Sequence, residues 1–556
     1  MKIPVSKLVV SYLERLGVEY IFGMPGAHVL PVYDSLYDSN VKSVLVKHEQ
    51  GAAFMAGGYA RASGRISACI TTAGPGATNL VTGVANAYAD RQPVLIITGE
   101  TSTHIFGKGG LQESSGEGGS IDQSALFRAI TRYNKIVERT DYLGQVLNQA
   151  SQILLSSNPG PVLLSFPFNV QKELVSGRIL DGVMTKRRVH VGRSYSSSVV
   201  PLAELLLAAQ RPVIVAGYGC IRSGAEELVA RLSESLHIPV ATSLKGKGVL
   251  SEHADLSLGS LGVTSSGKAY HYIVRKADLV IFLGAGFNER TSYLWDEKLL
   301  ADKRVVQVDN DPEQLEKVFE ADLAIHGDIK TVLARLLDQI EHSGRTRRVA
   351  PAVRKELLEL SDKPDEQASA VFQSDFSLVR GFFSRLERHF PEGASIFDDN
   401  IIFAQNFFNV SRGHRYFPNS GISSLGHAIP AAIGARFSDR RPTFAILGDG
   451  GFQMCCMEIM TAVNYRLPLN IVLFNNATMG LIRKNQFQQY HSRFIDCDFV
   501  NPDYRVLAKS FGIGYRRVAT EPDLDELFAN VDLVDSINLI EIPIDKDAFP
   551  IYNSGR

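Results

Sequence analysis

The sequence contains few cysteines for its length and no Cys-x-x-Cys pair. The five cysteines among the 556 residues are Cys69, Cys220, Cys455, Cys456 and Cys497. Their sparse, odd number argues against a disulfide framework, and the absence of the Cys-x-x-Cys spacing argues against a structural zinc site. We therefore expect a protein of a reducing compartment, with the cytoplasm as its location.

The chain also lacks an excess of either charge and lacks long apolar runs. Lys and Arg number 58 against 59 Asp and Glu, so we expect neither nucleic acid nor an anionic membrane as a partner. No apolar run reaches the roughly 18 residues that a membrane span needs. Residues 1–7 do not open an apolar signal segment. These absences favour a globular protein that acts on small molecules.

Short β-branched runs, many of them followed by glycine, alternate along the chain with helical stretches. Such runs occur at 94–98, 212–216, 279–283, 443–447 and 470–474. Strands that alternate with helices are typical of βαβ units and of a parallel sheet covered on both faces. The pattern therefore predicts the α/β fold class.

Two polar stretches, at about 171–198 and 341–370, divide the chain into thirds of similar texture. A length of this size favours two to four domains. We predict three doubly wound, parallel-sheet α/β domains, at 1–170, 190–340 and 371–550.

The most informative motif lies in the last third. A strand ends in Gly448-Asp449-Gly450-Gly451, a helical stretch follows, and a second strand ends in Asn475-Asn476. Glycines let backbone N–H groups approach an anion, and ligands bind at the carboxyl edge of such sheets. Asp449 and Asn476 supply the hard oxygen donors that Mg²⁺ prefers beside phosphate. The motif predicts a diphosphate held through Mg²⁺.

This motif and several others, in the same order, resemble those of thiamine diphosphate (ThDP) enzymes of the acetolactate synthase-like group. The resemblance extends over nearly the whole chain. The remaining segments that carry it are Phe22-Gly23-Met24-Pro25-Gly26, His48-Glu49-Gln50-Gly51-Ala52-Ala53, Gly74-Pro75-Gly76-Ala77-Thr78-Asn79, Ser420-Gly421 with Leu425-Gly426, and Ile429-Pro430-Ala431-Ala432-Ile433-Gly434.

The resemblance implies a pyrimidine-binding first domain, a nucleotide-binding-like central domain and a diphosphate-binding third domain. Glu49 matches the glutamate that activates the cofactor through its pyrimidine ring. Mg²⁺ is expected on Asp449, Asn476 and the Thr478 carbonyl group. The other residues expected at ThDP are Gly421, Ser423, Leu425, Gly448, Gly450, Gly451 and, in place of a missing polar stretch, Asn400. In this family one site is built by two subunits, so a homodimer or homotetramer is expected.

The sequence departs from acetolactate synthases near the reacting atoms. His28 replaces a small residue, as in benzaldehyde lyase and cyclohexanedione hydrolase, which carry a catalytic histidine there. Gln112 matches a glutamine that binds the substrate oxygen. After Leu481 and Ile482, Asn485 stands where the family has a tryptophan that narrows the acceptor pocket. A smaller, polar residue there predicts a larger or more polar acceptor.

The central third is similar to the family's FAD- or ADP-binding domain. Gly217-Tyr218-Gly219 follows one strand, Gly284 another, and Asp309 ends a third, placing an acidic group where a ribose can bind. The flavin-contacting motifs of the family are not matched at 286–290 or 262–265. FAD, ADP and an empty cleft all remain compatible with the sequence.

The resemblance implies ThDP- and Mg²⁺-dependent decarboxylation of a pyruvate-like 2-oxo acid, with transfer of the acyl carbanion to a carbonyl acceptor. His28 leaves open the alternative of a lyase or hydrolase that cleaves acyloins or diketones. A third hypothesis, a degenerate subunit without catalysis, is disfavoured by the joint presence of Glu49, Asp449 and Asn476.

Overall fold

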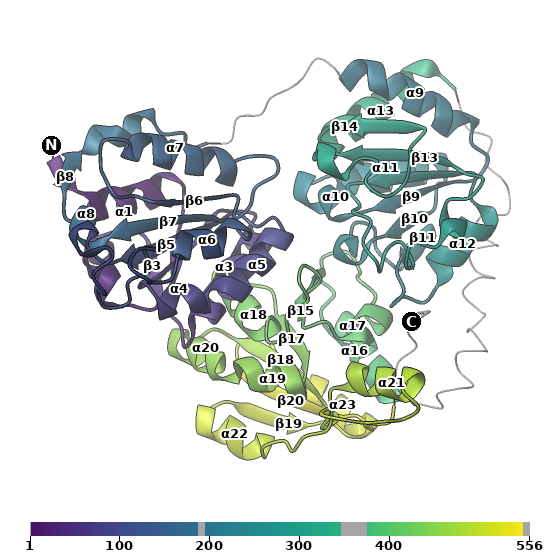
Figure 1. Ribbon diagram of the computed structural model, residues 1–556. Helices are drawn as coiled ribbons and strands as arrows, with labels where there is room; N and C mark the ends of the chain where they lie inside the picture. Colours follow the sequence, from purple (N-terminus) through teal and green to yellow (C-terminus); the bar gives the residue numbers. More distant parts are fainter. Residues whose placement is uncertain (1, 187–194, 346–374, 549–556) are drawn as a thin grey trace.

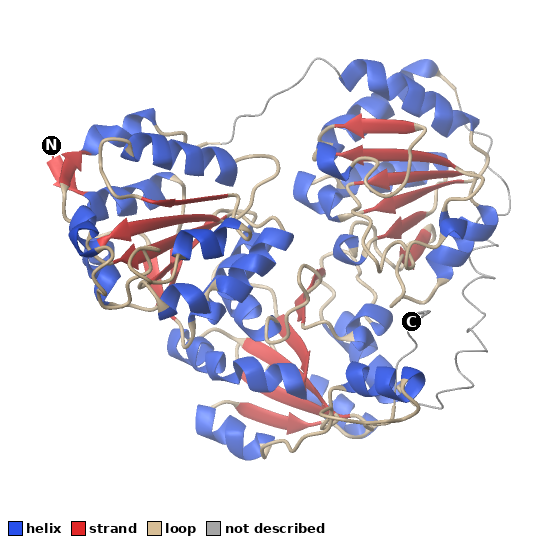
Figure 2. Cartoon of the chain, viewed as in Figure 1, coloured by secondary structure: helices blue, strands red, loops and turns tan. Residues whose placement is uncertain are grey.

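A computed structural model of the chain describes residues 2–186, 195–345 and 375–548. Three α/β domains follow one another along the chain (Figure 1), each with a six-stranded parallel sheet between helices (Figure 2). The predicted fold class is confirmed. Within the described residues, no helix is both long and apolar enough to cross a bilayer.

The sheet of the N-terminal domain has the strand order β3-β2-β4-β5-β7-β6, and every neighbouring pair is parallel. Its strands are β2 (Tyr20–Gly23), β3 (Lys42–Leu45), β4 (Ser67–Thr71), β5 (Val94–Glu100), β6 (Tyr133–Ile136) and β7 (Val162–Pro167). Its helices are α1 (Val5–Arg15), α2 (Leu30–Tyr37), α3 (Glu49–Ser63), α4 (Pro75–Asn79), α5 (Val81–Ala89), α6 (Gln123–Arg128), α7 (Leu143–Leu154) and α8 (Phe168–Gln171).

This domain continues beyond residue 170. Strand β8 (Leu174–Ser176) pairs with β1 (Lys2–Pro4) in a small antiparallel sheet. Val175, Leu180 and Val183 join the buried core of the domain. The first polar stretch is thus partly folded, and residues 187–194 and 346–370 of the two expected linkers lie outside the described residues.

The C-terminal domain repeats the topology of the first. Its order is β16-β15-β17-β18-β20-β19, so both terminal sheets read 2-1-3-4-6-5 when each domain's six strands are numbered along the chain. Its strands are β15 (Ser395–Asp398), β16 (Arg415–Pro418), β17 (Thr443–Gly448), β18 (Leu469–Asn475), β19 (Gly514–Arg517) and β20 (Ile537–Pro543). Its helices are α16 (Ser377–His389), α17 (Ile402–Phe407), α18 (Ala428–Arg436), α19 (Asp449–Cys455), α20 (Ile459–Tyr465), α21 (Gly480–Gln489), α22 (Tyr504–Phe511) and α23 (Glu521–Asn530).

The central domain has a different order, β11-β10-β9-β12-β13-β14, which reads 3-2-1-4-5-6. That is the order of dinucleotide-binding sheets. Its strands are β9 (Pro212–Ala216), β10 (Val240–Thr242), β11 (Ser257–Ser260), β12 (Leu279–Leu283), β13 (Arg304–Asp309) and β14 (Leu323–His326). Its helices are α9 (Tyr195–Ala208), α10 (Tyr218–Ser223), α11 (Glu226–Leu236), α12 (Lys268–Lys276) and α13 (Ile329–Ser343).

Helices α3 and α18 join the two terminal domains. Each is the crossover between the second and third strands of its sheet, and both contribute to one buried core that spans the two domains. The contact is reciprocal: a Cβ on Gly58 would overlap the carbonyl group of Ala431, and one on Gly434 would overlap that of Met55. Glycine is required at both positions because the two backbones touch.

We predict that Gly58→Ala destabilises the joined terminal domains by about 1–3 kcal/mol, because a methyl group cannot be added against a backbone without moving a helix. The neighbouring Gly57 is the matched control, since a Cβ there meets nothing within 4 Å. Gly57→Ala is expected to be neutral or slightly stabilising, because alanine favours a helix. Calorimetric unfolding of both variants beside the parent measures this. Equal losses of stability in the two variants would contradict the backbone contact between α3 and α18.

Candidate functional site

In each terminal sheet the strand order reverses at one point. In the N-terminal sheet this point lies between β2 and β4, and in the C-terminal sheet between β15 and β17. Ligands of open α/β sheets bind outside the carboxyl ends of the strands at such points. His28 and Thr72 follow the first pair of strands, and Asp399 and Asp449 follow the second. The topology thus defines two half-sites.

In the N-terminal half-site, His28 and Gln112 are linked through a threonine. The Nδ1 atom of His28 lies 3.2 Å from the hydroxyl oxygen of Thr72, and that hydroxyl donates to Oε1 of Gln112 over 3.0 Å. Burial lowers the pKa of His28, and hydrogen bonding with Gln112 opposes this only in part. The imidazole is therefore neutral near pH 7.

The backbone of His28 is fixed from two sides. Its carbonyl oxygen accepts a hydrogen bond of 2.6 Å from Nε2 of Gln171, a buried residue. On the other side it lies against Gly99 of β5, where a Cβ would overlap the His28 carbonyl group. The histidine is thus part of the packed domain rather than a polar residue on a free loop.

Gln112 is held in a strained backbone conformation, with φ of +55°. Two carboxylates fix the loop on either side of it. Glu100 accepts from the amide of Ser114, and Glu113 accepts from the amides of Gly107, Gly109 and Gly110. Those amides, with that of Gly107 foremost, lower the pKa of Glu113. The loop therefore presents the Gln112 side chain in one position.

Glu49 is the first residue of α3 and is buried. Its Oε2 accepts a hydrogen bond of 3.0 Å from Asn79. A Cβ on Gly76 would lie 3.4 Å from Oε1 of Glu49 and 3.0 Å from Cγ2 of Thr72, so both side chains border the same glycine. The N-terminal half-site thus brings Glu49, His28 and Gln112 together. Sequence reasoning missed Thr72, which lies two residues before the Gly74-Pro75-Gly76 turn.

In the C-terminal half-site, Asp449 begins α19 directly after β17. Its carboxylate accepts from the backbone amides of Gly450, Asn476 and Ala477, at 3.0, 3.1 and 2.6 Å. Burial raises its pKa, while a hydrogen bond from Asn501 and these amides act in the opposite direction. The GDG turn and the Asn-Asn turn are therefore joined through one carboxylate.

Asn501 is a second residue that sequence reasoning missed. Its Nδ2 donates to Oδ2 of Asp449 and to Oδ1 of Asn475, each over 2.8 Å. It stands 52 positions from Asp449, outside any recognisable spacing. The Asn501 side chain therefore links the GDG turn to the Asn-Asn turn.

The donors at these turns fit a magnesium ion that shares its coordination with phosphate. Asp449 and Asn476 offer side-chain oxygens, and Thr478 lies two residues beyond Asn476. Asp449 is the only carboxylate among them, and no group of three or more His, Cys, Asp or Glu able to hold a metal occurs in the described residues. Mg²⁺ suits such a set, because it is bound through one or two protein oxygens plus phosphate and water.

Asp399 organises the loop that leads into α18. Its carboxylate accepts from the amides of Gly426, His427 and Ala428, the N-terminus of that helix. Burial raises the pKa of Asp399 to about 6, although these amides favour the charged form. A Cβ on Gly451 would overlap this carboxylate, so the loop and the GDG turn meet at Asp399.

The loop residues expected at the cofactor lie before this point. Gly421 packs against Asp90 and Asn86 of the N-terminal domain. Ser423 has a positive φ of 57°, and Leu425 is half-buried. Among the buried polar atoms with no hydrogen-bond partner in the described residues are Asn419 Oδ1 and Ser420 Oγ, as expected of a loop shaped for a polar ligand.

Asn400 contacts another domain. It has a φ of +68°, and its Oδ1 accepts a hydrogen bond of 2.8 Å from Arg290 of the central domain. Among the described residues, no hydrogen bond joins its side chain to Gly448, Asp449 or Gly450. Asn400 thus has a contact between domains, and its expected role at the diphosphate stays a prediction.

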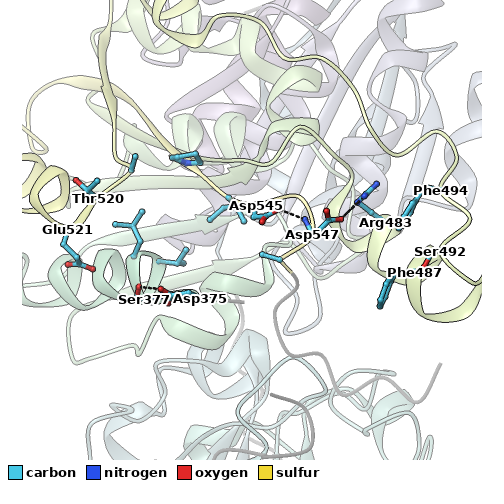
Figure 3. A pocket seen from close by; sticks show the side chains of 16 residues that line it. Asp375, Ser377, Arg483, Phe487, Ser492, Phe494, Thr520, Glu521, Asp545 and Asp547 are labelled. Atoms are coloured by element: carbon cyan, nitrogen blue, oxygen red, sulfur yellow. Dashed lines mark hydrogen bonds and ion pairs between the residues drawn. The ribbon is translucent and has the colours of Figure 1, made fainter. Parts of the chain in front are cut away.

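Helix α21 carries the residues expected in the substrate pocket. Leu481 and Ile482 are exposed, at 38% and 47%, and Asn485 is half-buried. Arg483 is buried and forms ion pairs with Asp498 and Asp547. A cavity of about 920 Å³ lies beside Arg483 and Phe487 (Figure 3), and none of the three expected residues lines it.

A second cavity, of about 400 Å³, lies where the three domains meet. The two glycine turns of the central domain border it and are in backbone contact, since a Cβ on Gly219 would lie 2.7 Å from Cα of Gly284. The residues that line it include Tyr218, Gly219, Gly284, Asp309, Lys245, Asp90 and Gly421. The central turns and Asp309 are thus gathered at one cavity, at the switch point of the 3-2-1-4-5-6 sheet.

Three family models of thiamine pyrophosphate enzymes match the chain. They are the N-terminal TPP binding domain at 3–125, the central domain at 199–336 and the C-terminal TPP binding domain at 400–542. The probable acetolactate synthase large subunit of Methanocaldococcus jannaschii is 32% identical, over 99% of this chain and 93% of its own. The acetolactate synthase isozyme 2 large subunit of Escherichia coli is 30% identical, over 99% and 97%.

We predict that Asp399 makes stability pH-dependent. Because its folded pKa is raised to about 6, its stabilising contribution is present at low pH and is lost as the pH rises through that value. Between about pH 5 and 7, the melting temperature of the parent should fall by about 2–4 °C relative to that of Asp399→Asn. Scanning calorimetry of cofactor-free protein measures this. If the difference in melting temperature between the two proteins does not change with pH, Asp399 does not titrate in this range.

Proposed function

The chain belongs to the acetolactate synthase-like family of ThDP-dependent enzymes, and on that premise we propose that it decarboxylates a pyruvate-like 2-oxo acid and joins the acyl group to a carbonyl acceptor. The observation that carries the proposal is the placement of the two family motifs. The GDG turn follows β17, at the reversal point of its sheet, and Asp449 joins it to the Asn-Asn turn after the neighbouring β18. Glu49 follows β3, which lies beside β2 at the reversal point of a sheet with the same topology.

Bound ThDP would supply a carbon nucleophile that accepts the acyl group. We propose that Glu49 holds a proton at the pyrimidine ring, since it is buried and its Oε1 lies beside the Gly74-Pro75-Gly76 turn. Gly421, Ser423 and Leu425 would orient that ring, and Gly448, Gly450 and Gly451 would admit the diphosphate. Mg²⁺ would bind Asp449, Asn476 and the Thr478 carbonyl oxygen.

The half-sites also bear on assembly. The hydrogen bonds described above for Glu49 lie within the N-terminal domain, and those of Asp449 within the C-terminal domain. We propose that a second copy of the chain completes each site, so that a homodimer, or a homotetramer built from it, is the active form.

Asn485 and its neighbours are proposed to set the acceptor. Exposed Leu481 and Ile482 and half-buried Asn485 line one turn of α21. With asparagine in place of a large aromatic residue, this turn has room for an acceptor larger or more polar than a second pyruvate.

The position of His28 favours a second candidate, the cleavage of 2-hydroxyketones or diketones. A neutral, buried imidazole beside Gln112 can move a proton at a substrate oxygen. This reaction uses the same cofactor and forms or breaks the same kind of carbon–carbon bond.

We propose that the cavity between the domains holds an adenine nucleotide, either FAD or ADP. Its two glycine turns and Asp309 suit a diphosphate and a ribose. Denaturing the purified protein and identifying released nucleotides by absorbance and mass spectrometry tests this. If neither FAD nor ADP is released, even after incubation of the protein with both, the cavity cannot be assigned to either nucleotide.

The reaction is tested by product analysis. Protein with ThDP, Mg²⁺ and pyruvate, with and without aldehydes, is expected to give acyloins or acetolactate, and 2-hydroxyketones test cleavage. Glu49→Gln should lower turnover by at least about 100-fold, because it removes an acid–base group. Glu320→Gln changes an exposed glutamate of the central domain and is the matched control. If the protein neither forms nor cleaves a carbon–carbon bond with any substrate of the panel, the proposal is refuted.

A further inference from the structure

Thr72 lies between the two polar side chains of the N-terminal half-site, and its hydroxyl group has only one hydrogen. That hydrogen is donated to Oε1 of Gln112, an acceptor. The contact of 3.2 Å between Thr72 Oγ1 and His28 Nδ1 must therefore be donated by the imidazole. A neutral imidazole carries one N–H, so a hydrogen on Nδ1 leaves the lone pair on Nε2.

The same chain of hydrogen bonds orients Gln112. Because Oε1 receives the hydroxyl group of Thr72, this amide end faces the threonine. Its NH₂ group, which has two donor hydrogens, is the other end of the planar amide. His28 thus offers an acceptor at Nε2, and Gln112 offers donors.

We propose that Thr72 is a positioning residue that fixes His28 as the Nδ1–H tautomer, so that Nε2 takes the proton of a substrate hydroxyl group. This inference rests on the proposed function, which places a 2-hydroxyketone or its precursor beside His28.

The step is balanced within these groups. The O–H bond of the substrate breaks, and its proton forms a bond to Nε2, which gives an imidazolium and an alkoxide. The imidazolium keeps its Nδ1–H donated to Thr72, and the alkoxide oxygen accepts from the Gln112 amide. The alkoxide collapses to a carbonyl group as the adjacent carbon–carbon bond breaks, and the electron pair of that bond stays on the departing carbon. The proton on Nε2 then passes to the product that carries this electron pair, and His28 is neutral again.

This assignment gives Thr72 a role of its own, although His28 and Gln112 also interact directly. An imidazole beside a lone amide can present either nitrogen as the donor. A hydroxyl group that is already committed to the amide oxygen can only accept from the histidine. Thr72 therefore selects between two tautomers that differ in the chemistry offered by Nε2.

The first test reads the tautomer without cofactor or substrate. Protein labelled with [¹⁵N]histidine is examined by solid-state NMR above the pKa of His28, where protonated and unprotonated ring nitrogens have distinct shifts. The signals of His28 among the 13 histidines are identified by their loss in His28→Gln. We expect a protonated Nδ1 and an unprotonated Nε2. A protonated Nε2 in the parent protein would overturn the inference.

Three variants separate positioning from packing. Thr72→Val keeps the shape but removes the hydroxyl group, and should give a mixture of tautomers with kcat lowered about tenfold and KM changed less than about twofold. Thr72→Ser should restore the parent spectrum and most of kcat. Thr242→Val is the matched control, because this buried threonine ends strand β10 of the central domain and its hydroxyl group has no hydrogen-bond partner in the described residues. An unchanged spectrum in Thr72→Val, or an equal loss in Thr242→Val, would refute the role of Thr72.

The two readouts distinguish the inference from its premise. The expected tautomer in a protein that neither makes nor breaks carbon–carbon bonds would refute the proposed function and leave the assignment of Nδ1–H standing. An active enzyme with the opposite tautomer would refute the assignment alone.

Discussion

The backbone contact between α3 and α18 is the constraint on which the arrangement of the terminal domains depends. At a contact where Gly58 meets Ala431 and Gly434 meets Met55, the helices cannot slide without a clash. Glu49 begins one helix, and the other follows the loop from Gly421 to His427. Fixing the crossing therefore fixes the position of the two half-sites of one chain relative to each other.

Buried charges reinforce this arrangement. Glu458 of the C-terminal domain accepts from the amides of Lys47 and His48 just before α3. Asp90 of the N-terminal domain pairs with Lys245 of the central domain and lies near Arg61 of α3. Burial alone would raise the pKa of Asp90, but Lys245 and Arg61 lower it. Each of these buried groups has its partner in another domain, so removing that partner while the group stays buried would be costly.

The sequence predicted the parts of the fold and site that local patterns specify. Glycine turns after β-branched runs located strand ends, and those of β9, β12 and β17 lie at the reversal points of their sheets. Thr72, Asp399 and Asn501 could not be found in this way, because their roles depend on partners brought close only by the fold. Asn400 was expected at the diphosphate because it stands before the cofactor loop. Its hydrogen bond to Arg290, 110 residues away, could not be predicted from that position. The end of the first domain was set too early because the pairing of β8 with β1 joins opposite ends of the domain.

The two kinds of control over the reaction arise from different domains. His28, Thr72 and Gln112 are fixed by the N-terminal sheet and by the carboxylates of Glu100 and Glu113. Asn485 lies on α21 of the C-terminal domain. In the reaction proposed above, proton transfer at the substrate oxygen and room for the acceptor would therefore depend on separate packing. A substitution at α21 would change the room for the acceptor and leave the hydrogen-bond chain from His28 to Gln112 intact, because no hydrogen bond among the described residues joins the two groups.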